Sequence, residues 1–185
     1  MTFTYKPVTP QTLKDLEAFS AAHGKFRYCS CMRWRLSSSE FSKSSKEERI
    51  AQLNQMVCEQ IPVGMLAYTS ESDVVGWCSI APRETFTALE RSRTLPRIDD
   101  TAVWSVTCFF IDRHYRRQKL TLGLLLSAID YAQSQGATTI EGYPVPPDAT
   151  SYTYMGSPNT FLQAGFVDVT PSGQKRQVYR FYTKP

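Results

Sequence analysis

The feature that most constrains this chain is an apolar strand signal followed at once by a basic turn and a helix signal. Residues 102–111 (AVWSVTCFFI) are apolar at nearly every position, which is typical of a central strand buried on both faces. From Leu120 the apolar residues recur at helical spacing for about four turns, and Gly136 is a stop signal. With a further strand signal at residues 138–145, the pattern predicts a crossover helix that joins two parallel strands.

The rest of the chain completes a mixed α/β pattern. Apolar and aromatic runs predict further strands, at residues 3–8, 63–68, 74–81 and 178–183, the middle two as a hairpin. Capping patterns and helical spacing predict further helices, beginning at Thr9 and Pro10, at the Ser45–Glu48 capping box, and at residues 159–166. A length of 185 residues favours one domain.

Composition limits the classes of function. The apolar content of 42% and charged content of 21% are ordinary for a globular protein, and a net charge of +4 without a cluster does not indicate nucleic-acid binding. No apolar run approaches the ~20 residues of a membrane span, and the first residues lack the apolar core of a signal peptide, so we expect a cytoplasmic protein without a membrane partner. Five cysteines are an odd number, which favours free thiols. Cys29 and Cys31 supply too few ligands for zinc, so no metal is expected.

The basic turn between the central strand and its helix is the strongest candidate for a ligand site. Arg116, Arg117 and Lys119 lie at or just before the predicted start of the helix. A helix N-terminus has unpaired N–H groups and a partial positive charge, so cations there are unfavourable unless an anion binds. The turn also follows the carboxyl end of a strand, where α/β sheets bind ligands. The pattern therefore favours a phosphate site, with a merely solvated turn as the alternative.

Residues 103–145 resemble the acetyl-coenzyme A binding motif of the GNAT superfamily of N-acetyltransferases. The family pattern is an apolar strand, then Arg/Gln-x-x-Gly-x-Gly/Ala, then a helix, and its six positions run here from Arg116 to Thr121. The helices, the hairpin and the closing segments FLQAGF and VYRFY also follow the family's order. The resemblance implies a single GNAT-like α/β domain over residues 1–185, with a mixed central sheet of about six to seven strands flanked by helices.

The resemblance also implies acetyl-CoA as co-substrate. The backbone of Phe109, Phe110 and Ile111 would pair with the pantetheine arm like an added strand. The N–H groups of the turn and the first helical residues would hold the pyrophosphate, namely those of Arg116, Arg117, Gln118, Lys119, Leu120, Thr121 and Leu122. Lys119 and Thr121 stand where the family has a glycine and a small residue. Because glycine permits a positive φ, Lys119 must either adopt an ordinary helical conformation or accept strain, while its ammonium is expected to reach a phosphate.

Acetyl transfer to an amine needs a base for the amine and benefits from a proton donor for the leaving thiolate. Many family members use a tyrosine at the position of Phe161, which cannot donate a proton. Tyr154 is therefore the preferred donor and Tyr152 the substitute, although either tyrosine can equally be a packing residue. Glu141, where the strand after the crossover helix ends, and Glu84, after the hairpin, are the candidate bases, and each can equally be an ordinary solvated glutamate.

The acceptor site is less defined by the sequence. Trp34 is expected to cover it, Tyr143 to form part of its wall, and Glu84 to lie within reach, while Cys108 reads as a core thiol rather than a nucleophile. Acidic residues in the segment 84–100 favour a cationic amine. We predict an enzyme, an N-acetyltransferase that moves the acetyl group of acetyl-CoA by direct attack of a small-molecule or peptide amine, in a monomer or homodimer. The alternative is a non-catalytic acyl-CoA-binding or sensor protein with the same fold.

Overall fold

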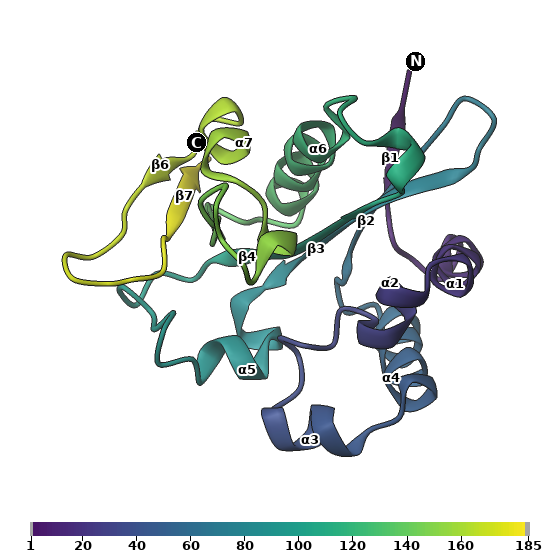
Figure 1. Ribbon diagram of the computed structural model, residues 1–185, viewed down its shortest axis with the longest axis horizontal. Coiled ribbons are helices and arrows are strands. Elements are labelled where there is room, and N and C mark those ends of the chain that lie inside the picture. The colour runs from purple at the N-terminus through teal and green to yellow at the C-terminus, as the bar shows by residue number, and fades with distance from the viewer. Residues whose placement is uncertain (1, 184–185) are drawn as a thin grey trace.

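The strands assemble into one mixed sheet with helices on both faces, as a computed structural model describes for residues 2–183 apart from the side chains of residues 25 and 27 (Figure 1). The seven strands lie in the order β1-β2-β3-β4-β5-β7-β6. Their bounds are β1 Thr4–Pro7, β2 Gly64–Tyr68, β3 Val74–Pro82, β4 Trp104–Ile111, β5 Thr139–Gly142, β6 Val167–Asp168 and β7 Tyr179–Tyr182. The β4–β5 pair is parallel and every other pair is antiparallel, which confirms the predicted crossover.

The four helices that the capping and spacing patterns indicate form in that order, together with three short ones. They are α1 Leu13–Ala22, α2 Gly24–Cys29, α3 Ser38–Lys43, α4 Lys46–Cys58, α5 Thr87–Glu90, α6 Leu120–Ser134 and α7 Pro158–Gln163, with short 3-10 turns η1 Arg83–Thr85, η2 Arg113–Tyr115 and η3 Thr153–Met155. None of the helices in residues 2–183 is both long and apolar enough to cross a bilayer.

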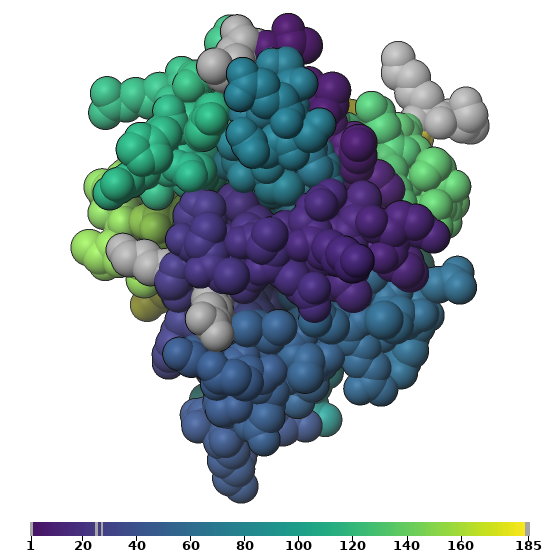
Figure 2. All heavy atoms as spheres, turned by 90° about the vertical axis from the view of Figure 1, so that its right-hand side faces the viewer, coloured from purple at the N-terminus to yellow at the C-terminus, as the bar shows by residue number. Residues whose placement is uncertain are grey.

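Each face of the sheet has its own apolar core. On one face, Leu124, Leu125 and Ala128 of α6 are fully buried against the middle strands. On the other, α1 and α4 cover Leu66 and Trp77. Figure 2 shows that the N-terminal part of the chain, which includes α1 to α4 and is coloured purple to blue, forms most of that side of the molecule.

The start of α1 differs from the prediction. Its N-cap is Thr12 rather than Thr9, because the hydroxyl of Thr12 accepts the Thr9 N–H at 2.9 Å and donates to the carbonyl of Pro7 at 3.0 Å, which holds Pro10 in a turn before the helix. α1 ends at Ala22, and the short helix α2 begins at Gly24. The Ser45–Glu48 capping box is confirmed at the start of α4.

The most consequential feature of the sheet is the limited pairing between β4 and β5. These strands pair only over Trp104–Val106, whereas β4 pairs with β3 as far as Ile111. Thr107 is an extra residue in the β3–β4 register, because Ser79 pairs with Cys108 while the next residue of β3 pairs with Val106. Beyond Val106, therefore, β4 has no strand on its β5 side, and the sheet divides there.

Candidate acetyl-CoA and acceptor site

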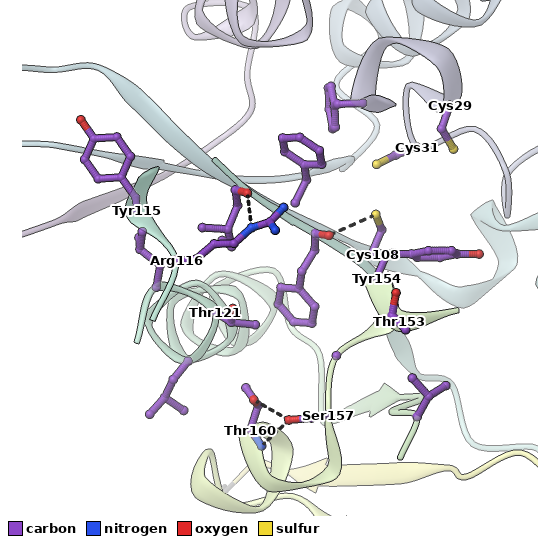
Figure 3. A pocket seen from close by; sticks show the side chains of 18 of the residues that line it. Cys29, Cys31, Cys108, Tyr115, Arg116, Thr121, Thr153, Tyr154, Ser157 and Thr160 are labelled. Atoms are coloured by element: carbon purple, nitrogen blue, oxygen red, sulfur yellow. Dashed lines mark hydrogen bonds between the residues drawn. The ribbon is translucent and has the colours of Figure 1, made fainter. Parts of the chain in front are cut away.

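A cavity of about 1030 Å³ lies along the unpaired part of β4. Figure 3 shows its two ends: Arg116 and Thr121 lie at the start of α6, and Cys29, Cys31 and Tyr154 lie on the opposite side of β4. We call the first the basic turn (residues 116–119) and the second the acceptor end. The acceptor end is formed by the loop after α2 and by η3, which packs against β4.

The basic turn contains two residues in the left-handed region. Arg117 has a φ of 63° and Lys119, the N-cap of α6, has φ 60° and ψ 15°. Of the two alternatives left open by the sequence, Lys119 therefore takes the glycine-like conformation, which costs a residue with a Cβ about 1–2 kcal/mol. This backbone is the one that a glycine would adopt without strain.

The backbone donors of this region are free of protein acceptors. None of the N–H groups from Arg116 to Leu122 donates to a described residue, and the first bond of the helix is Gly123 N–H to the carbonyl of Lys119, at 3.0 Å. The side chains of Arg116, Arg117 and Lys119 are exposed. A run of unpaired N–H groups beside three cations fits a pyrophosphate in charge and in donor number.

The unpaired edge of β4 forms the next part of the cavity wall. Phe109, Phe110 and Ile111 all line the cavity, on the side where β5 does not pair. The carbonyl of Ile111 accepts a long bond of 3.4 Å from Arg116 Nε, and that of Phe109 faces the Cys108 thiol at 3.8 Å (Figure 3). Both contacts are weak, so a stronger donor can replace them.

The acceptor end brings Tyr154 together with several thiols. Burial raises the pKa of the Tyr154 hydroxyl, and the nearby Cys108 and Cys29 thiols add to the shift, so the hydroxyl stays protonated at neutral pH. Burial also raises the pKa of Cys29, to about 11, and that of Cys31, whose sulfur accepts the Trp77 Nε1–H at 2.8 Å. The described cysteines are free, as predicted, and the raised pKa values of Cys29 and Cys31 do not favour their nucleophilic thiolate forms.

The family model for the Acetyltransferase (GNAT) family matches residues 29–150, which is more than half of the chain. The chain belongs to this family. Solved structures support the same fold: an N-acetyltransferase from Staphylococcus aureus Mu50 is 13% identical, with a TM-score of 0.59 and 100% of both chains covered. The PaiA N-acetyltransferase from Thermoplasma acidophilum, solved in complex with coenzyme A, is 13% identical, with a TM-score of 0.55 and 99% of this chain and 100% of that chain covered.

A third similar structure is that of the ribosomal-protein-alanine N-acetyltransferase from Brucella melitensis, which is 16% identical, with a TM-score of 0.56 and 97% and 99% of the two chains covered. No curated protein matches the sequence significantly. At these identities the structural likeness establishes the fold, and the family match establishes the acetyltransferase family.

Phe161, at the position where the resemblance implies a tyrosine as proton donor, belongs to the apolar core. Phe161 is fully buried, its ring lies within 6.2 Å of the ring of Phe109 and 4.9 Å of that of Phe166, and it does not line the cavity. A Cβ on Gly142 would collide with the Phe161 ring, so the two residues are packed in direct contact. Tyr154 does line the cavity, while Tyr152 lies behind it, with its ring 6.0 Å from that of Trp34.

Glu141 does not face the cavity, which corrects the prediction for this residue. Its carboxylate is 1% exposed and accepts hydrogen bonds from Arg83 Nη1 at 2.7 Å, Arg180 Nε at 2.8 Å and the Tyr143 hydroxyl at 2.7 Å. A carboxylate held by two arginines and shielded from water is not available to take a proton from an amine. Tyr143 is also fully buried, bonded to Glu141 and Ser105, and does not form a wall of the cavity.

The acidic residues expected near the acceptor are placed elsewhere. Glu84 is exposed and does not line the cavity. Glu90 pairs with Arg83 at 2.7 Å, and Asp99 pairs with Arg180 at 2.6 Å. Among the other predicted site residues, Trp34 lines the cavity. The predicted coenzyme-binding residues 109–111 and 116–122 also line it, with the exception of Gln118. The sequence did not single out Arg33 and Tyr28, which also line it.

No group of three or more His, Cys, Asp or Glu side chains suited to a metal ion occurs among the described residues. The cavity also has no acidic side chain among its lining residues, and its charged groups are all cations: Arg33, Arg116, Arg117 and Lys119. The cavity therefore combines a cationic end at the basic turn with an acceptor end in which hydroxyl, thiol and guanidinium groups are the polar groups.

Proposed function

We propose that this protein transfers the acetyl group of acetyl-CoA to an amine by direct attack. The observation that carries the proposal is the division of the sheet beyond Val106, which leaves the edge of β4 and the N-terminus of α6 on one continuous cavity. The unpaired backbone of β4 offers a strand-like partner for the pantetheine amides, and the free N–H groups from Arg116 to Leu122 offer donors for the phosphates.

The chemical step requires the amine nitrogen to form a bond to the thioester carbonyl carbon as the carbon–sulfur bond breaks. The thiolate then takes a proton, and the amine loses one. Tyr154 is the proposed donor to the sulfur, because its hydroxyl lines the cavity and burial keeps it protonated. The cavity lining has no carboxylate, so the amine has to lose its proton to water or arrive unprotonated. Much of the acceleration would come from holding the two reactants together.

The alternative of an acyl-CoA-binding protein without turnover has one observation in its favour, namely the absence of a carboxylate base from the cavity lining. The two functions differ in a single measurement, the release of free thiol from acetyl-CoA in the presence of an amine panel.

The experiment begins with melting temperatures in acetyl-CoA and in ATP. Acetyl-CoA should raise the melting temperature more than ATP at equal concentration, because only acetyl-CoA has the pantetheine arm and a ligand of the native state shifts unfolding by mass action. A melting temperature unmoved by millimolar acetyl-CoA would refute the coenzyme site. Binding together with amine-dependent thiol release would select the enzyme over the binding protein.

A further inference from the structure

The charged side chains that line the cavity are all cations, and one of them lies at the end opposite the proposed phosphate site. Arg116, Arg117 and Lys119 belong to the basic turn, but Arg33 comes from the loop after α2, at the acceptor end. Arg33 makes no ion pair with a described carboxylate, and its guanidinium carbon lies 5.7 Å from the centroid of the Phe41 ring. Half-buried at the cavity wall, it is a cation without a counter-charge.

Arg33 also lines a second hollow of about 510 Å³, which adjoins the acceptor end through Tyr28 and Phe41. The other lining groups of this hollow are serine hydroxyls and the cations Lys46 and Arg49. It likewise has no carboxylate in its lining. A group that extends from the acceptor end into this hollow therefore meets hydroxyls and cations but no carboxylate of the lining.

One further donor at the acceptor end lacks an acceptor, and so does one that lies outside the cavity lining. The Trp34 side chain is 8% exposed and lines the cavity, and its indole N–H has no hydrogen-bond partner among the described residues. Arg176 lies behind Tyr152, its guanidinium carbon 4.2 Å from the ring centroid, and its buried Nε–H is also without a partner there. Burial lowers the pKa of Arg176, as expected for a cation that no carboxylate compensates.

We infer that the acceptor amine carries an anionic group, a carboxylate or a phosphate, which Arg33 binds at the acceptor end of the cavity. This inference rests on the proposed function for the identity of the site. A cationic acceptor such as a polyamine would place its charge against uncompensated guanidinium groups, whereas an oxyanion would accept hydrogen bonds from them. The inference replaces the cationic amine that the acidic residues of the sequence suggested, since those residues do not line the cavity.

The test uses pairs of acceptors that differ only in the charged group. L-phenylalanine and L-leucine are compared with their carboxamides, and 2-aminoethyl phosphate is compared with ethanolamine, by calorimetry on protein saturated with CoA and by thiol release with acetyl-CoA. The carboxamides have the less basic amines, so dependence on amine deprotonation alone would favour them. Arg33→Gln is the test variant and Arg93→Gln, an exposed arginine that does not line the cavity, is the control with the same change in net charge.

The anionic member of at least one pair should bind about 10- to 150-fold more tightly, the range expected for one charge-assisted hydrogen bond, in the parent and in Arg93→Gln. Arg33→Gln should remove that preference. The carboxylate and phosphate pairs distinguish the two kinds of anion. Equal or tighter binding of the neutral members, a preference that survives Arg33→Gln, or no binding of any member would overturn the inference. CoA binding without thiol release would refute the proposed transfer, while the calorimetry would still decide the preference for an anion.

Discussion

Replacing Lys119 by glycine should make this protein more stable, although glycine usually destabilises. Lys119 has a φ of 60° and is the N-cap of α6, so its Cβ costs about 1–2 kcal/mol in this conformation. Glycine removes that cost but loses about 0.5–1 kcal/mol through its larger unfolded-state entropy. The difference is a gain of about 0.5–1 kcal/mol, which corresponds to a rise of roughly 1–4 °C in the melting temperature.

The matched control is Gln118→Gly, one residue earlier in the same exposed turn. Gln118 has no positive φ, so glycine there has the entropic cost without the relief of strain. Differential scanning calorimetry of the two variants without ligand should place Lys119→Gly above the parent and Gln118→Gly below it. A Lys119→Gly variant that melts no higher than Gln118→Gly would refute the assignment of strain to Lys119.

Two substitutions of Lys119 separate the effect of its charge on CoA binding from the effect of its backbone conformation. Lys119→Ala keeps the strained Cβ and loses the ammonium, so it should weaken CoA binding about 10- to 150-fold if that ammonium contacts a phosphate, with a shallower salt dependence. Lys119→Gly should recover part of this loss because the backbone can approach the phosphates more closely. Isothermal titration at two salt concentrations measures both effects. Unchanged affinity in Lys119→Ala would show that the ammonium remains in solvent.

Three further changes test other parts of the structure. Tyr154→Phe should lower kcat with little change in the KM for acetyl-CoA, whereas Tyr152→Phe should leave kcat near the parent value. Equal rates for Tyr154→Phe and the parent would exclude Tyr154 as the proton donor to the thiolate. Glu141→Gln leaves two buried arginines without their shared charge, and should cost about 3–5 kcal/mol in urea unfolding; a loss below about 1 kcal/mol would contradict this. Hydrogen bonds from Arg180 hold the pKa of Asp99 below its usual range, so the stability that they contribute is present above about pH 4 and is lost as the pH falls. Asp99→Asn should therefore reduce the decrease of the melting temperature in acid. An unchanged decrease would argue against this pair.

The sequence predicted those helices and strands that are determined by residues close together in the chain. The apolar run of β4, the helical spacing of α6 and the Ser45–Glu48 capping box each determine structure within a few residues, and each is confirmed. The same capping pattern begins α3 at Ser37, inside a serine-rich segment, and could have been recognised. β6 is an exposed two-residue strand, too short for any periodic signal.

The site residues whose positions were wrongly predicted are held by contacts between distant parts of the chain. Glu141 follows a predictable strand, but its burial depends on Arg83, 58 residues earlier, and on Arg180, 39 residues later. Arg33 was overlooked because its significance lies in a missing counter-charge, which only the arrangement of the whole cavity reveals. The acidic residues of the segment 84–100 therefore misled the choice of acceptor, since Glu90 and Asp99 pair with arginines and none of the acidic residues lines the cavity.

The buried ion cluster around Glu141 has a consequence for the division of the sheet. Arg83 follows β3, Glu141 lies on β5 and Arg180 lies on β7, so one carboxylate bonds to arginines from both sides of the β4–β5 pair, at the end where those strands still meet. Any change in the angle between the two halves would have to stretch these bonds. We therefore expect the fold, rather than the bound ligand, to set the angle between the two halves of the sheet. Acyl donors of different chain length would meet an entrance of the same width, and discrimination among them would depend on the side chains within.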